Sequence, residues 1–337
     1  MGRGIRVTGA AVAVVMLLGA CAASGARGNR SAGGARVVVV TTSILGDVVS
    51  HIAGDAAAVE VLMGPGVDPH AFEPSAAQAR RVREADLVVA NGLGLEPQLD
   101  DLLEQVEADG VPVLHVAEEV DPLPFALAAG EEDDHAEEGE DDHAEEGEDD
   151  GHGHGSLDPH FWFDPVRTAE AARLIGEELA GLDARGSDED WRARADAYAA
   201  EVLAVHQEVG ELLDGVPESR RRLVTNHDNL GYLAERYGYT IVGAVLPGGS
   251  TLAEASPADV AALAQLAIDA GVTAVFVETT ASQRLADALA REIGQDVAVV
   301  TLFTDALGPP GSGADTYLGL MRTNARRVVD ALGGSAT

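Results

Sequence analysis

Three histidines occupy distinctive short segments that are far apart in the sequence. His70 lies in Asp-Pro-His-Ala-Phe-Glu-Pro, His160 in Asp-Pro-His-Phe-Trp-Phe-Asp-Pro, and His227 in Asn-His-Asp-Asn-Leu-Gly-Tyr. Neutral imidazole is the commonest metal ligand in proteins, and three imidazoles with one carboxylate form a ligand set that suits zinc. These residues therefore point first to metal binding. The other histidines outside the acidic insertion described below are expected to be structural: His51, His115 and His206.

Alternating strands and helices are expected to carry these histidines. Continuous apolar runs typical of buried parallel strands occur in the first half of the chain at 37–40, 59–63, 86–90 and 111–115. A second set of runs lies at 222–225, 240–245, 274–277 and 297–302. Helical periodicity separates the strands in both halves. The sequence therefore predicts the α/β class, with two parallel-sheet lobes.

One long helical pattern separates the two predicted lobes. It runs over residues 187–214, where Ser187 and Asp190 form the start of a capping box. At 1.5 Å per residue this helix would be about 40 Å long, which exceeds what a crossover helix needs. We therefore expect a single linking helix between an N-terminal lobe, 36–186, and a C-terminal lobe, 215–337.

The carboxyl ends of the predicted strands carry candidate ligands. His70, His227 and Asp305 each follow a predicted strand, whereas His160 follows a long insertion. In open α/β sheets, ligands bind outside the carboxyl ends of the strands. If both lobes face one interlobe cleft, the first supplies His70 and His160 and the second supplies the other two. Glu278, also at a strand end, is expected either to orient a ligand histidine or to cap the next helix.

An acidic insertion, 121–156, interrupts the first lobe before His160. Residues 132–139 and 140–147 are the same eight residues, and 131–150 hold 14 acids and no basic residue. Such like-charged, apolar-poor sequence predicts disorder. The histidines of the insertion are expected to capture zinc weakly near the cleft, and the alternative is a solvated spacer. These histidines are His135, His143, His152 and His154.

The N-terminus is typical of an exported lipoprotein. A short basic stretch precedes a mostly apolar run, 7–18, that is too short for a membrane span. The only cysteine, Cys21, follows Leu-Gly-Ala, as in a bacterial lipobox whose cysteine is lipidated; the alternative is a signal peptide with an unmodified cysteine. We expect a signal peptide at 1–20, a lipid anchor, and a flexible tether at 21–35. The protein would then lie outside the cell membrane, on a Gram-positive surface or in a periplasm.

Composition argues against nucleic-acid binding and against an internal disulfide bond. The formal net charge is -35 and the basic residues are all arginine, so the chain lacks the basic face that nucleic-acid binding requires. A single cysteine cannot form an internal disulfide. With 337 residues, of which 46% are hydrophobic, the chain is long enough to form two lobes around a core.

The segments around the histidines resemble those of the metal-binding family of ABC-transporter solute-binding lipoproteins, which deliver zinc or manganese. The resemblance covers nearly the whole mature chain and includes both Asp-Pro-His segments, the Asn-His-x-x-x-Gly-Tyr segment, and Thr-Asp-Ala-Leu-Gly before Tyr317. It implies two (βα)4 lobes joined by one rigid helix. It also implies metal ligands at the positions of His70, His160, His227 and Asp305.

The resemblance also bears on the choice of metal. In this family, zinc-binding members have a histidine at the position of His227 and an acidic, histidine-rich loop before the second ligand. Manganese-binding members have a glutamate at the position of His227. This chain has the zinc pattern in both respects, and three imidazoles suit zinc better than the harder manganese ion. Where many zinc members read Asp-Pro-Leu-Gly, this chain reads Thr304-Asp305-Ala306. Either Asp305 or water is therefore expected as the fourth ligand.

We therefore expect a lipid-anchored extracytoplasmic protein that binds Zn²⁺ and delivers it to an ABC permease with its ATPase subunit. Manganese is the alternative cargo, and a surface adhesin or metal reservoir is an alternative role on the same scaffold. An enzyme, such as a zinc hydrolase with an open coordination position, is not expected because the chain has no His-Glu-x-x-His pattern. The protein is expected to act as a monomer and to bind no nucleic acid.

Overall fold

The computed structural model describes residues 36–127, 157–182, 188–246, 251, 256–279, 288–289, 291–294 and 297–334, in addition to Met1. Residues Ala35–Thr337 belong to one compact unit. The expected signal peptide and tether and most of the acidic insertion lie outside the described residues. The individual residues of interest that lie outside them are Cys21, His135, His143, His152 and His154.

The N-terminal half folds around a four-stranded parallel sheet. Its strands are β1 (Arg36–Val40), β2 (Ala57–Val61), β3 (Leu87–Ala90) and β4 (Val113–His115), in the order β2-β1-β3-β4. The helices that alternate with them are α1 (Ser43–Ala53), α2 (Ala76–Glu84) and α3 (Asp100–Ala108). Every residue of β3 and the last three of β1 are buried. Alternate residues of these strands pack toward α1 and toward α2 and α3, which explains why the strands are continuously apolar.

A second parallel sheet of four strands forms the C-terminal half. Its strands are β5 (Arg222–His227), β6 (Thr240–Leu246), β7 (Ala274–Glu278) and β8 (Ala298–Leu302), in the order β6-β5-β7-β8. Its helices are α6 (Gly231–Tyr237), α7 (Pro257–Asp269) and α9 (Tyr317–Ala331), and the described residues among 288–293 are also helical. These two sheets confirm the predicted α/β class and the predicted pair of parallel-sheet lobes.

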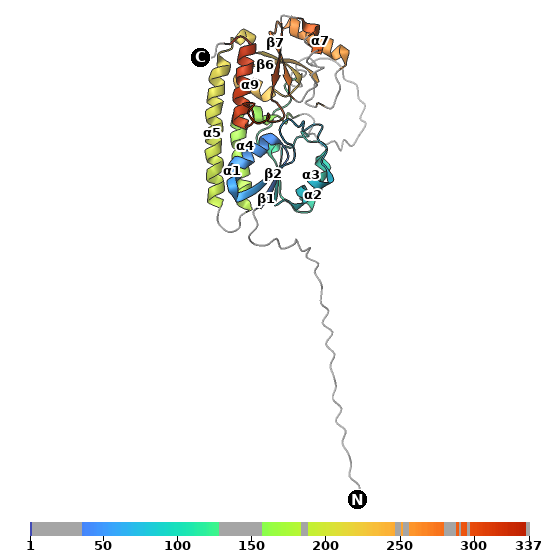
Figure 1. Cartoon of the computed structure of the whole chain (residues 1–337), viewed down its shortest axis with the longest axis vertical. Helices are drawn as coiled ribbons and strands as arrows, with labels where there is room; N and C mark the ends of the chain where they lie inside the picture. Colours follow the sequence, from blue (N-terminus) through green and yellow to red (C-terminus); the bar gives the residue numbers. More distant parts are fainter. Residues whose placement is uncertain are drawn as a thin grey trace, which may run out of the picture. The chain divides into compact units, whose positions relative to one another are not determined.

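The predicted linking helix is α5 (Asp188–Asp214). Its 27 residues make it about 40 Å long at 1.5 Å per residue. Figure 1 shows α5 extending beside elements of both halves, with α4 (Pro165–Gly181) and α9 next to it. A methyl group at Gly176 of α4 would come within 2.4 Å of the Ala195 side chain of α5. Glycine at this position therefore lets α4 and α5 lie in close contact.

Short hydroxyl side chains begin several of the helices. Thr42 caps α1 by accepting a hydrogen bond from the Leu45 amide at 3.3 Å. Ser75 and Ser256 begin capping boxes at α2 and α7. Short 3-10 turns are η1 (Gly54–Ala56), η2 (Val116–Glu119), η5 (Phe161–Phe163) and η6 (Glu218–Arg220).

One apolar core runs through both halves of the fold. Its buried side chains include Val38 of the first sheet, Trp162 of η5, Phe276 of the second sheet and Tyr317 of α9. Two smaller clusters lie on the outer sides of the sheets, one beneath α2 and α3 and the other beneath α7. The two lobes are therefore joined by packing as well as by α5.

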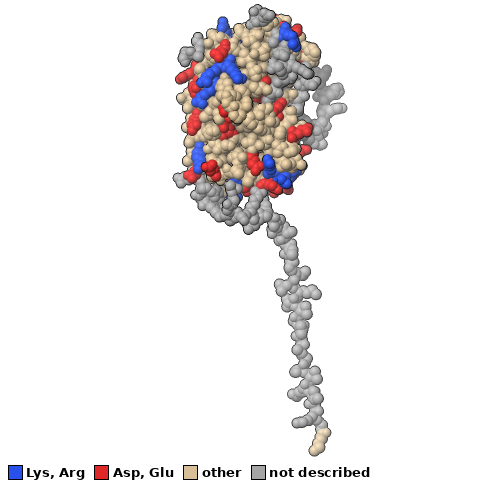
Figure 2. All heavy atoms as spheres, in the orientation of Figure 1, with Lys and Arg blue, Asp and Glu red and all other residues tan. Residues whose placement is uncertain are grey.

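Acidic and basic side chains are interspersed over the face of the molecule seen in Figure 2. Within the described part of the chain, none of the helices combines the length and the apolar character that crossing a membrane requires. Residues 131–150 hold 14 of the 57 acidic residues, so the described part is less acidic than the net charge of -35 suggests.

Candidate metal centre

Four buried side chains from both halves meet where the strands of the two sheets end. They are His70, His160, His227 and Asp305. One potential ligand atom of each lies within 4.8 Å of those of the other three. His227 is the last residue of β5, and the others lie on segments after β2, before α4 and after β8. The structure thus brings together the four residues that sequence reasoning selected.

His160 is oriented by the aspartate two residues before it. Its Nδ1 atom lies 2.7 Å from Oδ1 of Asp158, and the same oxygen accepts a hydrogen bond from the His160 amide at 2.9 Å. Both side chains are fully buried. When Asp158 is ionised, its carboxylate only accepts hydrogen bonds, so Nδ1 carries the proton and Nε2 of the neutral ring presents its lone pair to the site. A carboxylate placed in this way fixes the tautomer of a metal-binding histidine.

His227 has an equivalent partner in Glu278, the last residue of β7. Nδ1 of His227 lies 2.9 Å from Oε1 of Glu278. Glu278 also accepts hydrogen bonds from Nδ2 of Asn226 and, at 3.2 Å, from Oγ1 of Thr304. Its own amide donates to Oδ1 of Asn226 at 3.0 Å. This contact is the one that a residue orienting the His227 imidazole would make.

The imidazoles of His160 and His227 face each other through their second nitrogens. The two Nε2 atoms are 3.4 Å apart. Because each Nδ1 atom is bonded to a carboxylate, each Nε2 atom presents a lone pair when both rings are neutral, and two lone pairs at this distance repel each other. Asp305 adds a carboxylate, with Oδ1 at 3.7 Å from Nε2 of His160 and Oδ2 at 3.9 Å from Nε2 of His227. A cation between these atoms would turn the repulsion into attraction.

His70 and Asp305 complete the cluster with two buried atoms that lack partners. Nε2 of His70 and Oδ1 of Asp305 have no hydrogen-bond partner within the described part of the chain. The centroid of the His70 ring lies 5.6 Å from that of His160 and 5.5 Å from that of His227. A buried polar atom without a partner is destabilising and calls for an explanation such as a missing ion. The two atoms therefore indicate where an ion would bind.

Burial sets the protonation state of the cluster. It lowers the pKa of His70 and of His160 well below the usual 6.5, and neighbouring imidazoles lower the pKa of each further. Burial also raises the pKa of Asp305 well above the usual 3.8, as does the negative charge of Glu278. For Glu278 burial raises the pKa, but the electrostatic interaction with His227 and several hydrogen bonds outweigh burial and lower it. His70 and His160 are therefore neutral at pH 7, which is the form that binds metal.

Sequence reasoning missed residues that support the ligands, above all Asp158 and Thr304. Asp158 holds the imidazole of His160, and Thr304 bonds to the carboxylates of both Glu278 and Asp305. The repeated Asp-Pro-His segment could have identified Asp158 from the sequence. In the other copy of that segment, Oδ1 of Asp68 accepts a hydrogen bond from the amide of the ligand-type histidine at 2.9 Å.

The three histidines expected to be structural lie outside the four-residue cluster. His51 stacks on Tyr198 with ring centroids 4.8 Å apart. Nδ1 of His206 lies 3.1 Å from the hydroxyl oxygen of Tyr237, and His115 is the last residue of β4. These contacts are in keeping with structural roles.

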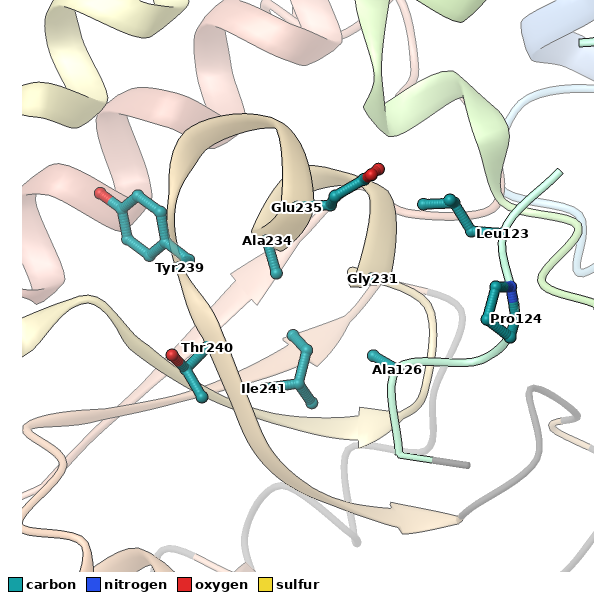
Figure 3. A pocket seen from close by; sticks show the side chains of 9 residues that line it. All are labelled: Leu123, Pro124, Ala126, Gly231, Ala234, Glu235, Tyr239, Thr240 and Ile241. Carbon is teal, nitrogen blue, oxygen red and sulfur yellow. The ribbon is translucent and has the colours of Figure 1, made fainter. Parts of the chain in front are cut away.

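A separate pocket of about 350 Å³ lies beside α6 and the start of β6 (Figure 3). Its lining is mostly apolar and includes Leu123, Ala234 and Ile241. The only charged side chain among the residues that line it is Glu235, and the lining includes none of the four clustered residues. The pocket is therefore not part of the candidate metal centre.

Known proteins resemble this chain over nearly its whole length. Residues 38–331 match the family described as "Zinc-uptake complex component A periplasmic" (ZnuA). The chain is 30% identical over 331 residues to the zinc-binding protein TroA of Treponema pallidum, covering 97% of this chain and 98% of TroA. It is 29% identical over 321 residues to the manganese-binding lipoprotein MntA of Halalkalibacterium halodurans, covering 95% and 96% of the two chains. The solved structure of the periplasmic zinc-binding protein TroA from Treponema pallidum has a TM-score of 0.74 at 28% identity, over 89% of this chain and 99% of that chain.

The family match and the shared fold agree with the resemblance stated from the sequence and confirm it. The match spans most of the chain, and the lobes of TroA correspond to the two parallel-sheet lobes described above. Family membership also confirms that the protein is a solute-binding transport protein rather than an enzyme. The chain belongs to the ZnuA family of metal-binding solute-binding proteins of ABC transporters.

Proposed function

We propose that this protein binds Zn²⁺ between its two lobes and delivers it to an ABC permease that works with an ATPase subunit. The observation that carries the proposal is the pair of Nε2 atoms of His160 and His227, which lie 3.4 Å apart while both Nδ1 atoms are bonded to carboxylates. This arrangement supports a cation site, and membership of a transport family supports delivery. The proposed ligands are His70, His160, His227 and Asp305.

The chemistry of the proposed ligands favours zinc. Zinc takes imidazole nitrogens at about 2.0–2.1 Å, usually in tetrahedral sites with four ligands. Three neutral imidazoles and one carboxylate would leave a net charge of about +1, and the carboxylates of Asp158 and Glu278 behind two of the imidazoles place negative charge next to it. We favour Asp305 over water as the fourth ligand because its Oδ1 atom is buried without a partner among the described residues and lies 3.7 Å from Nε2 of His160.

Manganese is the second candidate cargo, because MntA, at 29% identity, is named a manganese-binding lipoprotein. The zinc-binding TroA is similar to the same degree, so overall identity does not discriminate between the two metals. Manganese is the harder ion and prefers oxygen ligands. Of the four proposed ligands only Asp305 supplies oxygen, and the ligand set therefore favours zinc.

We also propose that a lipid on Cys21 holds the protein outside the cytoplasm. The names of relatives support this location, because MntA is called a lipoprotein and the TroA structure is described as periplasmic. The tether, 21–35, would then keep the lobes close to the permease. The proposal includes action as a monomer, and the net charge of -35 supports the absence of nucleic-acid binding.

The acidic insertion is proposed to be an accessory that captures zinc weakly and raises its concentration near the cluster. Its histidines are His135, His143, His152 and His154. Ordering a segment that is predicted to be disordered opposes binding, so its affinity should lie well below that of the buried cluster. If the insertion held the tight site instead, a metal reservoir or an adhesin on the same scaffold would describe the protein better.

The proposal is tested by titrating the full chain with zinc and with manganese, beside a variant that lacks 131–155 and a His227→Ala variant. We expect one tight zinc site that survives the deletion, is lost in His227→Ala, and binds manganese more weakly. Loss of tight binding in the deletion variant would favour the reservoir. Tighter binding of manganese than of zinc would favour the manganese alternative.

A further inference from the structure

The segment 158–164, which contains His160, is bonded at both ends to α6. The carbonyl oxygen of its first residue accepts a hydrogen bond at 2.8 Å from the hydroxyl of Tyr232. At its other end, both carboxylate oxygens of Asp164 accept hydrogen bonds from Arg236, with Nε at 2.8 Å from Oδ1 and Nη2 at 2.6 Å from Oδ2. A ligand-bearing segment of the first lobe is therefore fixed against a helix of the second lobe.

The pair formed by Asp164 and Arg236 joins a fully buried carboxylate to a partly exposed guanidinium. The Asp164 side chain has no exposed surface, and the Arg236 side chain is 32% exposed. Asp164 also accepts hydrogen bonds from the Val166 amide, at the start of α4, and from Nη1 of Arg167. Bidentate arginine–carboxylate pairs are strong and fix orientation as well as distance. Arg236 therefore holds α6 against the start of α4 in one geometry.

The position of α6 in turn determines the position of His227. Strand β5 ends at His227 and α6 begins at Gly231, with three buried residues between them. The carbonyl oxygen of His227 accepts hydrogen bonds from the Asn229 amide at 3.0 Å and from Oγ1 of Thr225 at 2.7 Å. Because the connection is short, buried and bonded, a shift of α6 is transmitted to the His227 imidazole.

We propose that Arg236 is a positioning residue that controls how long the metal is retained. Through Asp164 it holds α6, and with it His227, against the segment that carries His160. The Nε2 atoms of these two histidines lie 3.4 Å apart, and in neutral rings whose Nδ1 atoms carry the protons their lone pairs repel each other when no cation lies between them. Their close approach therefore needs an independent brace. This inference rests on the proposed function, because it takes His160 and His227 to be metal ligands.

Arg236 can be replaced without opening the core. It lines a surface groove of about 490 Å³ together with His206 and Gly210 of α5. When Arg236 is removed, Arg167 still donates to Asp164, so the buried carboxylate keeps a charged partner. Glutamine lacks the positive charge and the paired N–H donors of the guanidinium, but it leaves a polar group at the groove. Arg236→Gln is therefore expected to fold.

The test measures zinc release from the full chain. Protein loaded with one equivalent of zinc is mixed with an excess of a chromophoric chelator, and association is followed separately in a stopped-flow instrument. Arg236→Gln is expected to raise the dissociation rate constant about tenfold, which corresponds to ~1.4 kcal/mol, and to leave the association rate constant nearly unchanged. Arg236→Lys keeps the positive charge but lacks the paired N–H donors of the guanidinium. Its zinc dissociation rate constant should therefore lie between those of the wild type and Arg236→Gln. In the metal-free protein, amide hydrogen exchange in α6 should be faster in Arg236→Gln.

Arg322→Gln is the matched control. Nε of Arg322 lies 2.7 Å from Oε2 of Glu208, so the variant removes an ion pair between α9 and α5 whose arginine is 36% exposed and whose carboxylate is 41% exposed. Its zinc dissociation should match that of the wild type. An unchanged dissociation rate in Arg236→Gln, an equal rise in Arg322→Gln, or a lysine variant no slower than the glutamine variant would each overturn the inference. A wild-type chain that binds no zinc would instead overturn the proposed function.

Discussion

His160 and His227 are 67 residues apart in the sequence, yet their Nε2 atoms lie 3.4 Å apart. A carboxylate fixes each ring from behind, Asp158 at 2.7 Å for His160 and Glu278 at 2.9 Å for His227. Facing lone pairs oppose folding, so the surrounding hydrogen bonds and packing must hold the two imidazole rings in place against this repulsion. The pair is therefore preorganised for a cation, and preorganisation reduces the entropy lost when the cation binds.

Replacement of His227 by alanine should lower the zinc affinity more than about 100-fold. Loss of a metal ligand should cost more than the 10–100-fold that follows loss of a hydrogen-bond partner of a ligand. Competition with a chelator of known affinity measures the change. His51→Ala is the control, since His51 stacks on Tyr198 outside the cluster, and its zinc affinity should equal that of the wild type. Wild-type affinity in His227→Ala would place the tight site elsewhere.

Glu278→Gln should lower the zinc affinity by about 10–100-fold. The amide removes the negative charge behind the His227 imidazole and accepts the hydrogen bond from Nδ1 less strongly. Glu107→Gln is a suitable control because Glu107 forms an exposed pair with His115, 3.8 Å apart, outside the cluster. The same competition experiment applies to both variants. Equal affinities for the two would show that Glu278 does not orient a ligand.

Zinc binding should release a proton from Asp305 at pH values below its raised pKa, with a further contribution from Asp158. Burial and the charge of Glu278 raise the pKa of Asp305 well above the usual 3.8, so below that pKa the metal displaces the proton of its carboxyl. Burial also raises the pKa of Asp158 to about 7. Protons therefore compete with zinc below the pKa of Asp305, and the zinc affinity should rise as the pH rises toward that pKa.

Calorimetry in buffers with different ionisation enthalpies measures this proton release. Asp305→Asn should lower the number of released protons by about one and flatten the dependence of affinity on pH, because the amide has no proton to lose. Release that is the same in wild type and Asp305→Asn would mean that Asp305 is not the group whose proton the metal displaces.

His227→Glu should shift the metal preference from zinc toward manganese. The substitution exchanges a nitrogen ligand for oxygen and leaves two imidazoles and two carboxylates, which is a harder ligand set. We expect the ratio of manganese to zinc affinity to rise about tenfold, the equivalent of ~1.4 kcal/mol. Parallel titrations with the two metals provide the ratio, and His227→Gln, which lacks the carboxylate, serves as the control. A ratio that does not move would show that the ligand type at this position does not set the preference.

Local patterns in the sequence were sufficient to predict the α/β class, whereas the membership of the cluster rested also on the resemblance to the metal-binding family. The apolar runs of β1 and β3 predicted buried parallel strands, and the helical periodicity predicted α5 within one residue of its observed start at Asp188. Strand ends explained the candidates His70, His227 and Asp305, but their meeting with His160 depended on both lobes facing one cleft. His227 differs slightly from the prediction, because it is the last residue of β5 rather than a residue after the strand.

Contacts across the lobe boundary were not predictable, because they depend on how the two sheets dock. Examples are the hydrogen bond from Trp162 Nε1 to the Thr304 carbonyl at 2.9 Å and the ion pair between Arg236 and Asp164. Hydrophobic periodicity determines which face of an element is buried but not which side chain of another lobe it meets. For the same reason the sequence left two roles open for Glu278 and did not predict its contact with the His227 ring.

The claim that three histidines and one carboxylate hold zinc is tested most directly by X-ray absorption at the zinc K-edge of the chain loaded with one equivalent of zinc. The account predicts four nitrogen or oxygen ligands at about 2.0–2.1 Å, with the multiple-scattering signal of three imidazoles. The imidazole signal should fall by one third in His70→Ala. A zinc ion surrounded only by oxygen, or an imidazole signal that His70→Ala leaves unchanged, would contradict the account.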